Sequence, residues 1–292
     1  MKSLAHIVAA TDLSQGAEQA LRRSVMLASE HGVALDVLHV VPRSGMEELR
    51  WAGSSARLRQ GFRRLAREDL EALAASLGSP VKIDVNVEMG DVVRRIAARA
   101  GGDTLVVVGA RGQGAFRDLL LGSTAERLLG RARGAVLIVK AAPAAAYRNV
   151  VAGLDLQAGS EGVLDAALRV APTAGVTAMH AYDVPFEGML LRAGTRQDDV
   201  ERHRGEVLRD ALATLDAIVR RDGAQARRIV AVAERSHPVR LLLEHPAARD
   251  ADLIVLGRPP RTAAERLLVG SVARHVIAGA GRDVLLVPQE HA

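Results

Sequence analysis

The chain has 292 residues, 49% of them hydrophobic, which suffices for one large domain or two of ordinary size. Cysteine is absent, which excludes disulfides and thiolate metal sites and fits a reducing compartment. The strand-like apolar runs are too short to span a membrane and no signal peptide is apparent, so we expect a cytoplasmic protein without a membrane partner.

The positive charge of the chain does not indicate a nucleic-acid site. The net charge is +5, and only three of the 39 cationic residues are lysines. The arginines are interleaved with acids, as in ARLRQGFRRLAREDLEAL, which is typical of a solvated helix face. With 2% aromatic residues there is little surface on which bases could stack. We therefore expect no nucleic-acid partner.

The chain begins with alternating strand and helix patterns. HIVAA at residues 6–10 predicts a strand, and residues 15–31 predict a helix with its apolar residues on one face. Gly32 follows as an expected C-cap, because glycine adopts the left-handed conformation without strain. VALDVLHVV at 33–41 predicts the second strand. The longer helix after it is expected to use the following apolar residues: Leu58, Phe62, Leu65 and Leu73.

The same alternation continues to about residue 140. VKIDVNV predicts a third strand, and a short helix is expected from Asp91. TLVVVG, a helix from about Ser123 and AVLIVK complete the series. Strands that alternate with helices predict a parallel, doubly wound sheet, which binds ligands beyond the carboxyl ends of its strands. Asp12 and Gly109 both follow such strand ends, so we expect both in one crevice.

The second half of the chain repeats the first. HIVAATDLSQGAEQAL resembles NVVAGLDLQAGSEGVL, and TLVVVGARGQGAFRDLLLGSTAERLL resembles DLIVLGRPPRTAAERLLVGSVARHVI. DVLHVVP and GAVLIVK likewise have counterparts in TAMHAYDVP and RDVLLVP, in the same order. Four ordered matches indicate a tandem duplication. We expect two α/β domains with five-stranded sheets over residues 1–141 and 148–292, joined by a linker over 142–147.

The most unusual stretch is the glycine-rich loop after TLVVVG. It lacks the G-x-x-x-x-G-K-[ST] and G-x-G-x-x-G signatures of known phosphate loops. Gly109 and Gly112 nevertheless permit positive φ and close backbone approach. Gly122, Ser123 and Thr124 bring N–H groups and hydroxyls to a helix N-terminus, where the dipole favours an anion. The alternative is an ordinary surface loop in which Ser123 merely caps the helix and Asp12 caps its own helix or loop.

A family resemblance favours the phosphate site. Gly109-x2-Gly112-x9-Gly122-Ser123 matches the G-x2-G-x9-G-[ST] pattern of the ATP-binding branch of the universal stress protein family. The resemblance extends to the opening strand with Asp12 and to the LHV of the second strand, and it covers essentially the whole chain as two tandem domains. It implies a Rossmann-like fold of the adenine nucleotide α-hydrolase type, with the last strands pairing the two halves into an internal pseudo-dimer. A homodimer of the whole chain would be compatible with it.

The resemblance also implies a site for ATP, ADP or AMP, with Mg²⁺. Asp12 would contact adenosine, and the backbone of Val40 would contact the adenine base. Gly109 would approach the ribose or the α-phosphate. The other glycines and the hydroxyls would hold the phosphates. Ala125 stands where the family often has another hydroxyl, which leaves the number of phosphates open. We expect ten nucleotide-binding residues: Ala10, Thr11, Asp12, Val40, Gly109, Arg111, Gly112, Gly122, Ser123 and Thr124.

The second glycine loop has lost part of this pattern. Pro259 and Pro260 replace residues of the first loop, and proline has no N–H to offer a phosphate. Val272 replaces the hydroxyl of Thr124. Asp155 persists as the counterpart of Asp12. We therefore expect the N-terminal domain to bind ATP and the C-terminal domain to bind it weakly or not at all.

No catalytic motif stands out, and the nearby Asp12 and Asp118 support at most slow ATP hydrolysis. The resemblance favours a regulatory protein of stress adaptation that acts through a protein partner. One alternative is an adenylating or pyrophosphatase enzyme of the same fold, although ATDLSQGAEQ lacks the usual serine- and glycine-rich loop. The other is a nucleotide-free scaffold.

Overall fold

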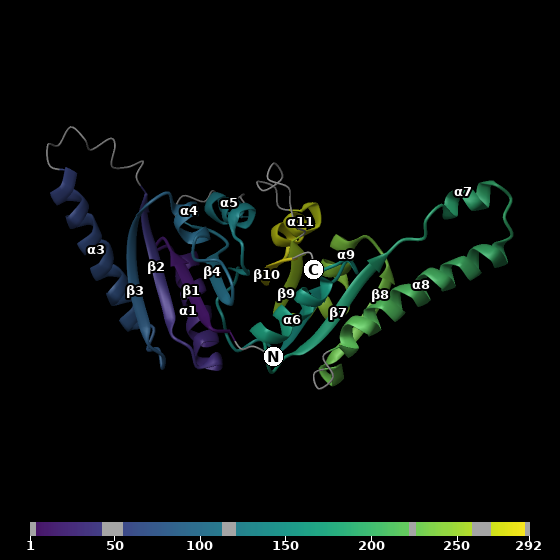
Figure 1. Ribbon diagram of the computed structural model, residues 1–292, viewed down its shortest axis with the longest axis horizontal. Helices are drawn as coiled ribbons and strands as arrows, with labels where there is room; N and C mark the ends of the chain where they lie inside the picture. Colours follow the sequence, from purple (N-terminus) through teal and green to yellow (C-terminus); the bar gives the residue numbers. More distant parts are fainter. Residues whose placement is uncertain (1–3, 43–54, 113–120, 222–225, 259–269, 290–292) are drawn as a thin grey trace. The chain divides into compact units, whose positions relative to one another are not determined.

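The computed structural model describes residues 4–42, 55–112, 121–221, 226–258 and 270–289 (Figure 1). The chain divides into two compact units. The first comprises Met1–Ala146, Arg261–Val269 and Gly281–Pro288, and the second comprises Tyr147–Pro260, Gly270–Ala280 and Gln289–Ala292. Pro259, Pro260 and Asp118, on which part of the sequence argument rests, lie outside the described residues.

The first unit is built on five parallel strands in the order β3-β2-β1-β4-β5. Their bounds are β1 His6–Thr11, β2 Leu35–Pro42, β3 Ile83–Gly90, β4 Thr104–Gly109 and β5 Val136–Val139. Strand β1 lies between β2 and β4, so the order reverses beside it. This confirms the expected α/β fold and places the switch point at the carboxyl ends of β1 and β4.

A sixth strand in this unit comes from the end of the chain. Strand β10 (Asp283–Pro288) pairs antiparallel with β5, with Leu285 opposite Leu137. The predicted pairing between the last strands of the two repeats is therefore present. Beside it, the Asp283 carboxylate receives a hydrogen bond from Arg23 Nε at 3.2 Å and from the backbone N–H of Lys140 at 2.9 Å. Both ion-pair side chains are buried, with 8% of Arg23 and 3% of Asp283 exposed.

The helices of the first unit are α1 (Gln15–His31), α3 (Ser55–Ser76), α4 (Val92–Ala97) and α5 (Ser123–Arg131). Helix α1 has the predicted bounds and ends at Gly32, whose φ of 65° is left-handed. Asp91 caps α4 by accepting a 2.7 Å hydrogen bond from Arg94 N–H. The predicted face of α1 is buried: Ala17, Leu21, Val25 and Ala28.

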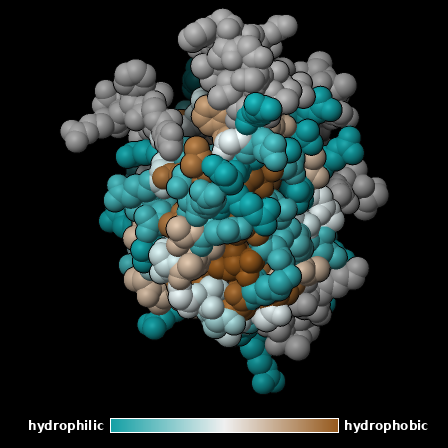
Figure 2. Space-filling view, turned by 90° about the vertical axis from the view of Figure 1, so that its left-hand side faces the viewer, coloured by the Kyte–Doolittle hydropathy of each residue, from teal (hydrophilic) through white to brown (hydrophobic). Residues whose placement is uncertain are grey.

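Helix α3 departs from its predicted apolar face. Leu70 is fully buried, whereas 41% of Phe62 and 54% of Leu65 are exposed. Its polar residues form exposed i,i+4 ion pairs such as Arg67–Glu71, as expected for a solvated face. Figure 2 shows this side of the molecule, where hydrophobic residues lie scattered among hydrophilic ones. The predicted face is therefore wrong at Phe62 and Leu65, and Leu70 is the residue that packs into the core.

The second unit repeats the topology of the first. Its parallel strands are β6 Asn149–Gly153, β7 Gly175–Tyr182, β8 Ile229–Arg235 and β9 Leu253–Arg258, in the order β9-β6-β7-β8. The helices are α6 Ser160–Val170, α7 Glu187–Arg192, α8 Gln197–Arg220, α9 Pro238–Glu244, α10 Pro246–Arg249 and α11 Ser271–Gly279, with a 3₁₀ turn at Ala226–Arg228. Tyr147, at the end of the expected linker, is 1% exposed and belongs to this unit.

Candidate functional site

A cavity of about 530 Å³ opens at the carboxyl ends of β1, β2 and β4 in the first unit. Its volume falls within the roughly 300–1,000 Å³ of typical ligand pockets. The structure brings all ten residues of the predicted nucleotide site around it: Ala10, Thr11, Asp12, Val40, Gly109, Arg111, Gly112, Gly122, Ser123 and Thr124. The cavity therefore lies where the topology of the sheet places a ligand.

A tight turn after β1 presents Asp12 to the cavity. The Asp12 carboxylate accepts a 3.1 Å hydrogen bond from Ser14 N–H, and Leu13 between them adopts a left-handed φ of 64°. Such a conformation is strained for a residue with a Cβ. Ser14 caps α1 by accepting from Ala17 N–H at 3.2 Å. Asp12 thus holds the turn, and the alternative that it caps the helix itself is wrong.

Gly109, the last residue of β4, and Gly112 allow close packing of the backbone and do not adopt a positive φ. Neither Gly109 nor Gly112 has a positive φ, which corrects that expectation. A Cβ on Gly109 would lie 2.7 Å from the carbonyl oxygen of Gly16, so the fold itself requires glycine there. A Cβ on Gly112 would lie 2.3 Å from Asp12 Oδ2, which is the mobile end of a side chain. Gly112 is therefore required as long as the Asp12 carboxylate keeps its place.

Helix α5 points its first turn at the cavity. Its N-cap is Gly122 and its first helical residue is Ser123, so the alternative that Ser123 is the N-cap is wrong. No side chain of the described residues caps it. Gly122 N–H donates to Ala110 O at 2.8 Å, which fixes the helix start against the end of β4. The hydroxyls of Ser123 and Thr124 are exposed, in the first turn where the dipole attracts an anion.

An apolar wall lines part of the cavity. Val92 and Ile96 from α4 line it together with Leu38 of β2. Sequence reasoning missed these residues, although the helix predicted from Asp91 carries valine and isoleucine at the right spacing to face the sheet. His39 also lines the cavity, and its Nδ1 donates to Thr11 O at 2.9 Å, which ties β2 to β1.

Two cations lie near the glycine loop. Arg111 lines the cavity. Burial, followed by the positive charge of Arg111, lowers the pKa of Lys140, and the Asp283 carboxylate partly opposes this effect. The parallel register places Val139 opposite Gly109, so Lys140 and Arg111 follow neighbouring strand ends. The sequence analysis considered only the glycine loop and so missed Lys140 as a second cation. The parallel order of β4 and β5 places Lys140 at the neighbouring strand end.

A family model decides the identity of this fold. The model of the universal stress protein family matches residues 4–140 and again 146–288. The chain belongs to the universal stress protein family. The two matches confirm the tandem repeat inferred from the sequence.

Relatives and solved structures agree with this assignment. The chain is 28% identical to a universal stress protein of Mycolicibacterium smegmatis over 96% of each chain. It is 27% identical to one of Mycobacterium tuberculosis, covering 98% of this chain and 96% of that one. A universal stress protein from Archaeoglobus fulgidus shares the fold with a TM-score of 0.67 at 18% identity, over 99% of this chain and all of that one.

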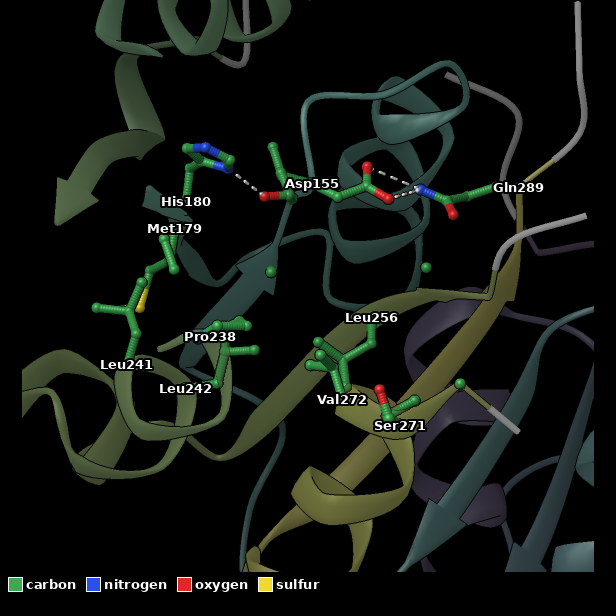
Figure 3. Close-up of a pocket in the computed structure, with 16 residues that line it drawn as sticks. Asp155, Met179, His180, Pro238, Leu241, Leu242, Leu256, Ser271, Val272 and Gln289 are labelled. Atoms are coloured by element: carbon green, nitrogen blue, oxygen red, sulfur yellow. Dashed lines mark hydrogen bonds between the residues drawn. The ribbon is translucent and has the colours of Figure 1, made fainter. Parts of the chain in front are cut away.

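The second universal stress domain has its own cavity of about 400 Å³, at the corresponding strand ends (Figure 3). The turn after its first strand repeats that of the first domain: Gln157 N–H donates to Asp155 Oδ1 at 3.0 Å, and Leu156 has a φ of 59°. The His180 ring bonds to Leu154 O at 2.8 Å, as His39 does to Thr11. The shared geometry shows that the turn belongs to the fold rather than to one ligand.

The lining of this second cavity differs in charge. Val272 takes the place of Thr124, and Leu241 and Leu242 of α9 and Leu256 of β9 also line the cavity. Arg111 lines the first cavity, whereas Asp155 is the only Asp, Glu, Lys or Arg among the described residues around the second. Within the described residues there is no cation there to meet a phosphate.

Neither a membrane helix nor a metal cluster is found in the described part of the chain. None of its helices is both long and apolar enough to cross a bilayer. Groups of three or more His, Cys, Asp or Glu side chains suited to a metal ion are also absent from those residues.

Proposed function

We propose that this universal stress protein is an ATP-binding regulatory protein of stress adaptation, with the nucleotide bound in the N-terminal unit. The observation that carries the proposal is the convergence of all ten residues of the family's ATP pattern and its flanks around one cavity of about 530 Å³. Thr11 and Thr124 are distant in sequence, and the sheet topology brings both to this cavity, which supports a binding site there.

The apolar wall of the cavity suits adenosine. Val92, Ile96 and Leu38 offer a surface on which a flat base can be buried, and Val40 is a strand residue whose backbone borders it. The Asp12 carboxylate, fixed by Ser14 N–H, accepts hydrogen bonds and therefore suits the hydroxyls of a ribose. The apolar wall thus suits the base of adenosine, and the Asp12 carboxylate suits its ribose.

Other residues around the same cavity suit phosphates. The first turn of α5 contributes backbone N–H groups and the hydroxyls of Ser123 and Thr124. Arg111, which lines the same cavity, adds a positive charge. The charge of Arg111 also helps to lower the pKa of Lys140. Helix N-termini and cations together are a common arrangement for binding a polyphosphate.

Magnesium would be held chiefly by the nucleotide. Three described cavity residues carry hydroxyl oxygens, which suit a hard cation: Thr11, Ser123 and Thr124. Thr11 Oγ1 already accepts a hydrogen bond from Leu13 N–H, so Ser123 and Thr124 are the better candidates. A bound Mg²⁺ would neutralise part of the phosphate charge. Because the carboxylate of Asp12 is engaged in its turn, we propose a role in binding, with at most slow hydrolysis.

Calorimetric titration of the variants Gly122→Val and Gly270→Val with ATP tests this proposal. Both glycines are N-caps in an extended conformation, at the starts of α5 and α11 respectively. A Cβ on Gly122 would make only an ordinary 3.4 Å contact with Ala110 O, so the fold accepts it while the valine methyls intrude on the ligand. We expect at least a tenfold loss of ATP affinity for Gly122→Val and no change for Gly270→Val. Equal affinities for both variants would refute the proposal.

Mass spectrometry of the purified protein under native conditions provides an independent check. Co-purified ATP, ADP or AMP at up to one molecule per chain would support the site and identify the preferred nucleotide. Only nucleotide-free protein that also fails to bind added ATP would favour the nucleotide-free scaffold instead.

A further inference from the structure

The side chain of Gln289 lies in the second cavity, next to Asp155. Gln289, which directly follows β10, is 5% exposed and lines the cavity. Its Nε2 lies 3.2 Å from Oδ1 and 3.4 Å from Oδ2 of Asp155 (Figure 3). A carboxylate only accepts hydrogen bonds, so the amide nitrogen of Gln289 must face Asp155.

Gln289 also fills the space beside the glycines of this unit. In the first unit, the backbones of Gly16 and Gly109 touch each other, since a Cβ on Gly109 would lie 2.7 Å from Gly16 O. Their counterparts are Gly159 and Gly257. A Cβ on Gly257 would lie 2.6 Å from Gln289 Cδ, and one on Gly159 would lie 2.8 Å from Gln289 Cβ. The Gln289 side chain therefore occupies the place where the corresponding elements of the first unit meet.

The carboxylate of Asp155 is occupied by the chain as a result. Besides Gln289, Ser160 Oγ donates to its Oδ1 at 2.8 Å and Gln157 N–H at 3.0 Å. Asp12 in the first unit faces the bare Cα of Gly112, and Ala141 is the counterpart of Gln289 in the first repeat. The two aspartates thus occupy the same turn but face different neighbours.

We propose that Gln289 is the residue that excludes nucleosides from the C-terminal cavity. Its amide takes the hydrogen-bonding positions on Asp155 that the ribose hydroxyls of a nucleoside would use, and its stem fills the adjoining space. This inference rests on the proposed function, in which the equivalent Asp12 receives adenosine. It goes beyond the loss of the glycine pattern, because it explains exclusion of the nucleoside itself and not only of its phosphates.

Replacing Gln289 with alanine tests the proposal, with adenosine as the probe. Adenosine carries no phosphate, so the changed loop of the second unit does not decide the result. Equilibrium dialysis with radiolabelled adenosine counts the sites per chain. We expect the Q289A protein to bind one adenosine more per chain than the wild type. The double variant Q289A/D155N should lose that additional site.

Two further variants keep the test decisive. Gln289→Leu keeps a side chain of similar size without the amide, so this variant should gain no adenosine site. It therefore separates the effect of filling the space from the effect of losing the hydrogen bond to Asp155. Gln289→Ser also opens the space and serves if the alanine variant does not fold. Equal numbers of adenosine sites in folded wild type and in both opened variants would overturn the proposal. Failure of the wild type to bind ATP, measured in parallel, would instead contradict the proposed function.

Discussion

The backbone of Gly109 lies directly against that of Gly16, because a Cβ on residue 109 would come within 2.7 Å of the Gly16 carbonyl oxygen. A Cβ on Gly16 would conversely lie 2.4 Å from Arg111 O. Real Cβ atoms do not approach backbone oxygens so closely. The first glycine of the pattern therefore lets the end of β4 pack closely on α1.

Gly109→Ala should therefore destabilise the fold and not only the site. We expect a loss of about 1–3 kcal/mol in the free energy of unfolding, as for other overpacked positions, measured by urea denaturation. Gly61→Ala in α3 is the matched control, because a Cβ there meets nothing within 4 Å. Alanine in a helix interior should stabilise that variant by up to about 1 kcal/mol. A Gly109→Ala protein as stable as the wild type would show that the close contact is absent in solution.

The buried ion pair Arg23–Asp283 should be important for stability. Asp283→Ala would leave Arg23 buried without its carboxylate, and breaking a buried pair in this way costs about 3–5 kcal/mol. Glu18→Ala breaks the exposed pair with Arg22 on the same helix and should cost about 0.3–0.5 kcal/mol. Thermal and urea denaturation of both variants compare the two effects. Similar losses for both would contradict the buried pairing.

Lys140 should give stability a defined pH dependence. Burial lowers the pKa of Lys140 in the folded protein below the ordinary value of 10.5. Between the lowered pKa and 10.5 the unfolded chain binds more protons than the folded one, so the free energy of unfolding rises with pH. Lys140→Met keeps the apolar stem but removes the charge.

The difference in stability between wild type and Lys140→Met isolates this effect from other groups. We expect the wild type to gain stability relative to the variant as the pH rises through that window. Urea denaturation of both proteins between pH 7 and 10.5 provides the measurement. A difference that stays constant, or that falls with pH, would show that the folded protein does not disfavour the charged lysine.

Arg111 should distinguish phosphate binding from nucleoside binding. Arg111→Met removes a cation that lines the cavity and leaves the apolar wall intact. Charge-assisted hydrogen bonds contribute roughly 1.5–3 kcal/mol, so ATP affinity should fall by roughly tenfold to a hundredfold. Adenosine affinity should stay within about twofold. Calorimetry with both ligands checks this, and an equal loss for adenosine would place Arg111 elsewhere in the site.

Much of the fold was predictable because local patterns and tertiary structure agree. The apolar spacing of Ala17, Leu21 and Val25 coincides with burial against the sheet, and Gly32 ends the helix as a left-handed C-cap. The tandem repeat supplied a second copy of the strand order. Helix α3 was harder because Phe62 and Leu65 fit a helical face but are exposed, whereas Leu70 is buried.

The site was predictable where it depends on the family pattern and on strand ends. Contacts between distant segments were not. The sequence does not show that Gly16 packs on Gly109 or that Gln289 reaches Asp155. The expected positive φ at Gly109 and Gly112 was wrong, because glycine is used there for close approach. These relationships depend on three-dimensional packing, which a single sequence does not reveal.

The stoichiometry of ATP binding to the full chain tests the central proposal most directly. Isothermal titration calorimetry with ATP and Mg²⁺ should give one tight site per chain in the wild type. That site should be weakened by Gly122→Val and unaffected by Gly270→Val. Two tight, equivalent sites per chain, or a single site indifferent to Gly122→Val, would contradict an ATP site confined to the N-terminal unit.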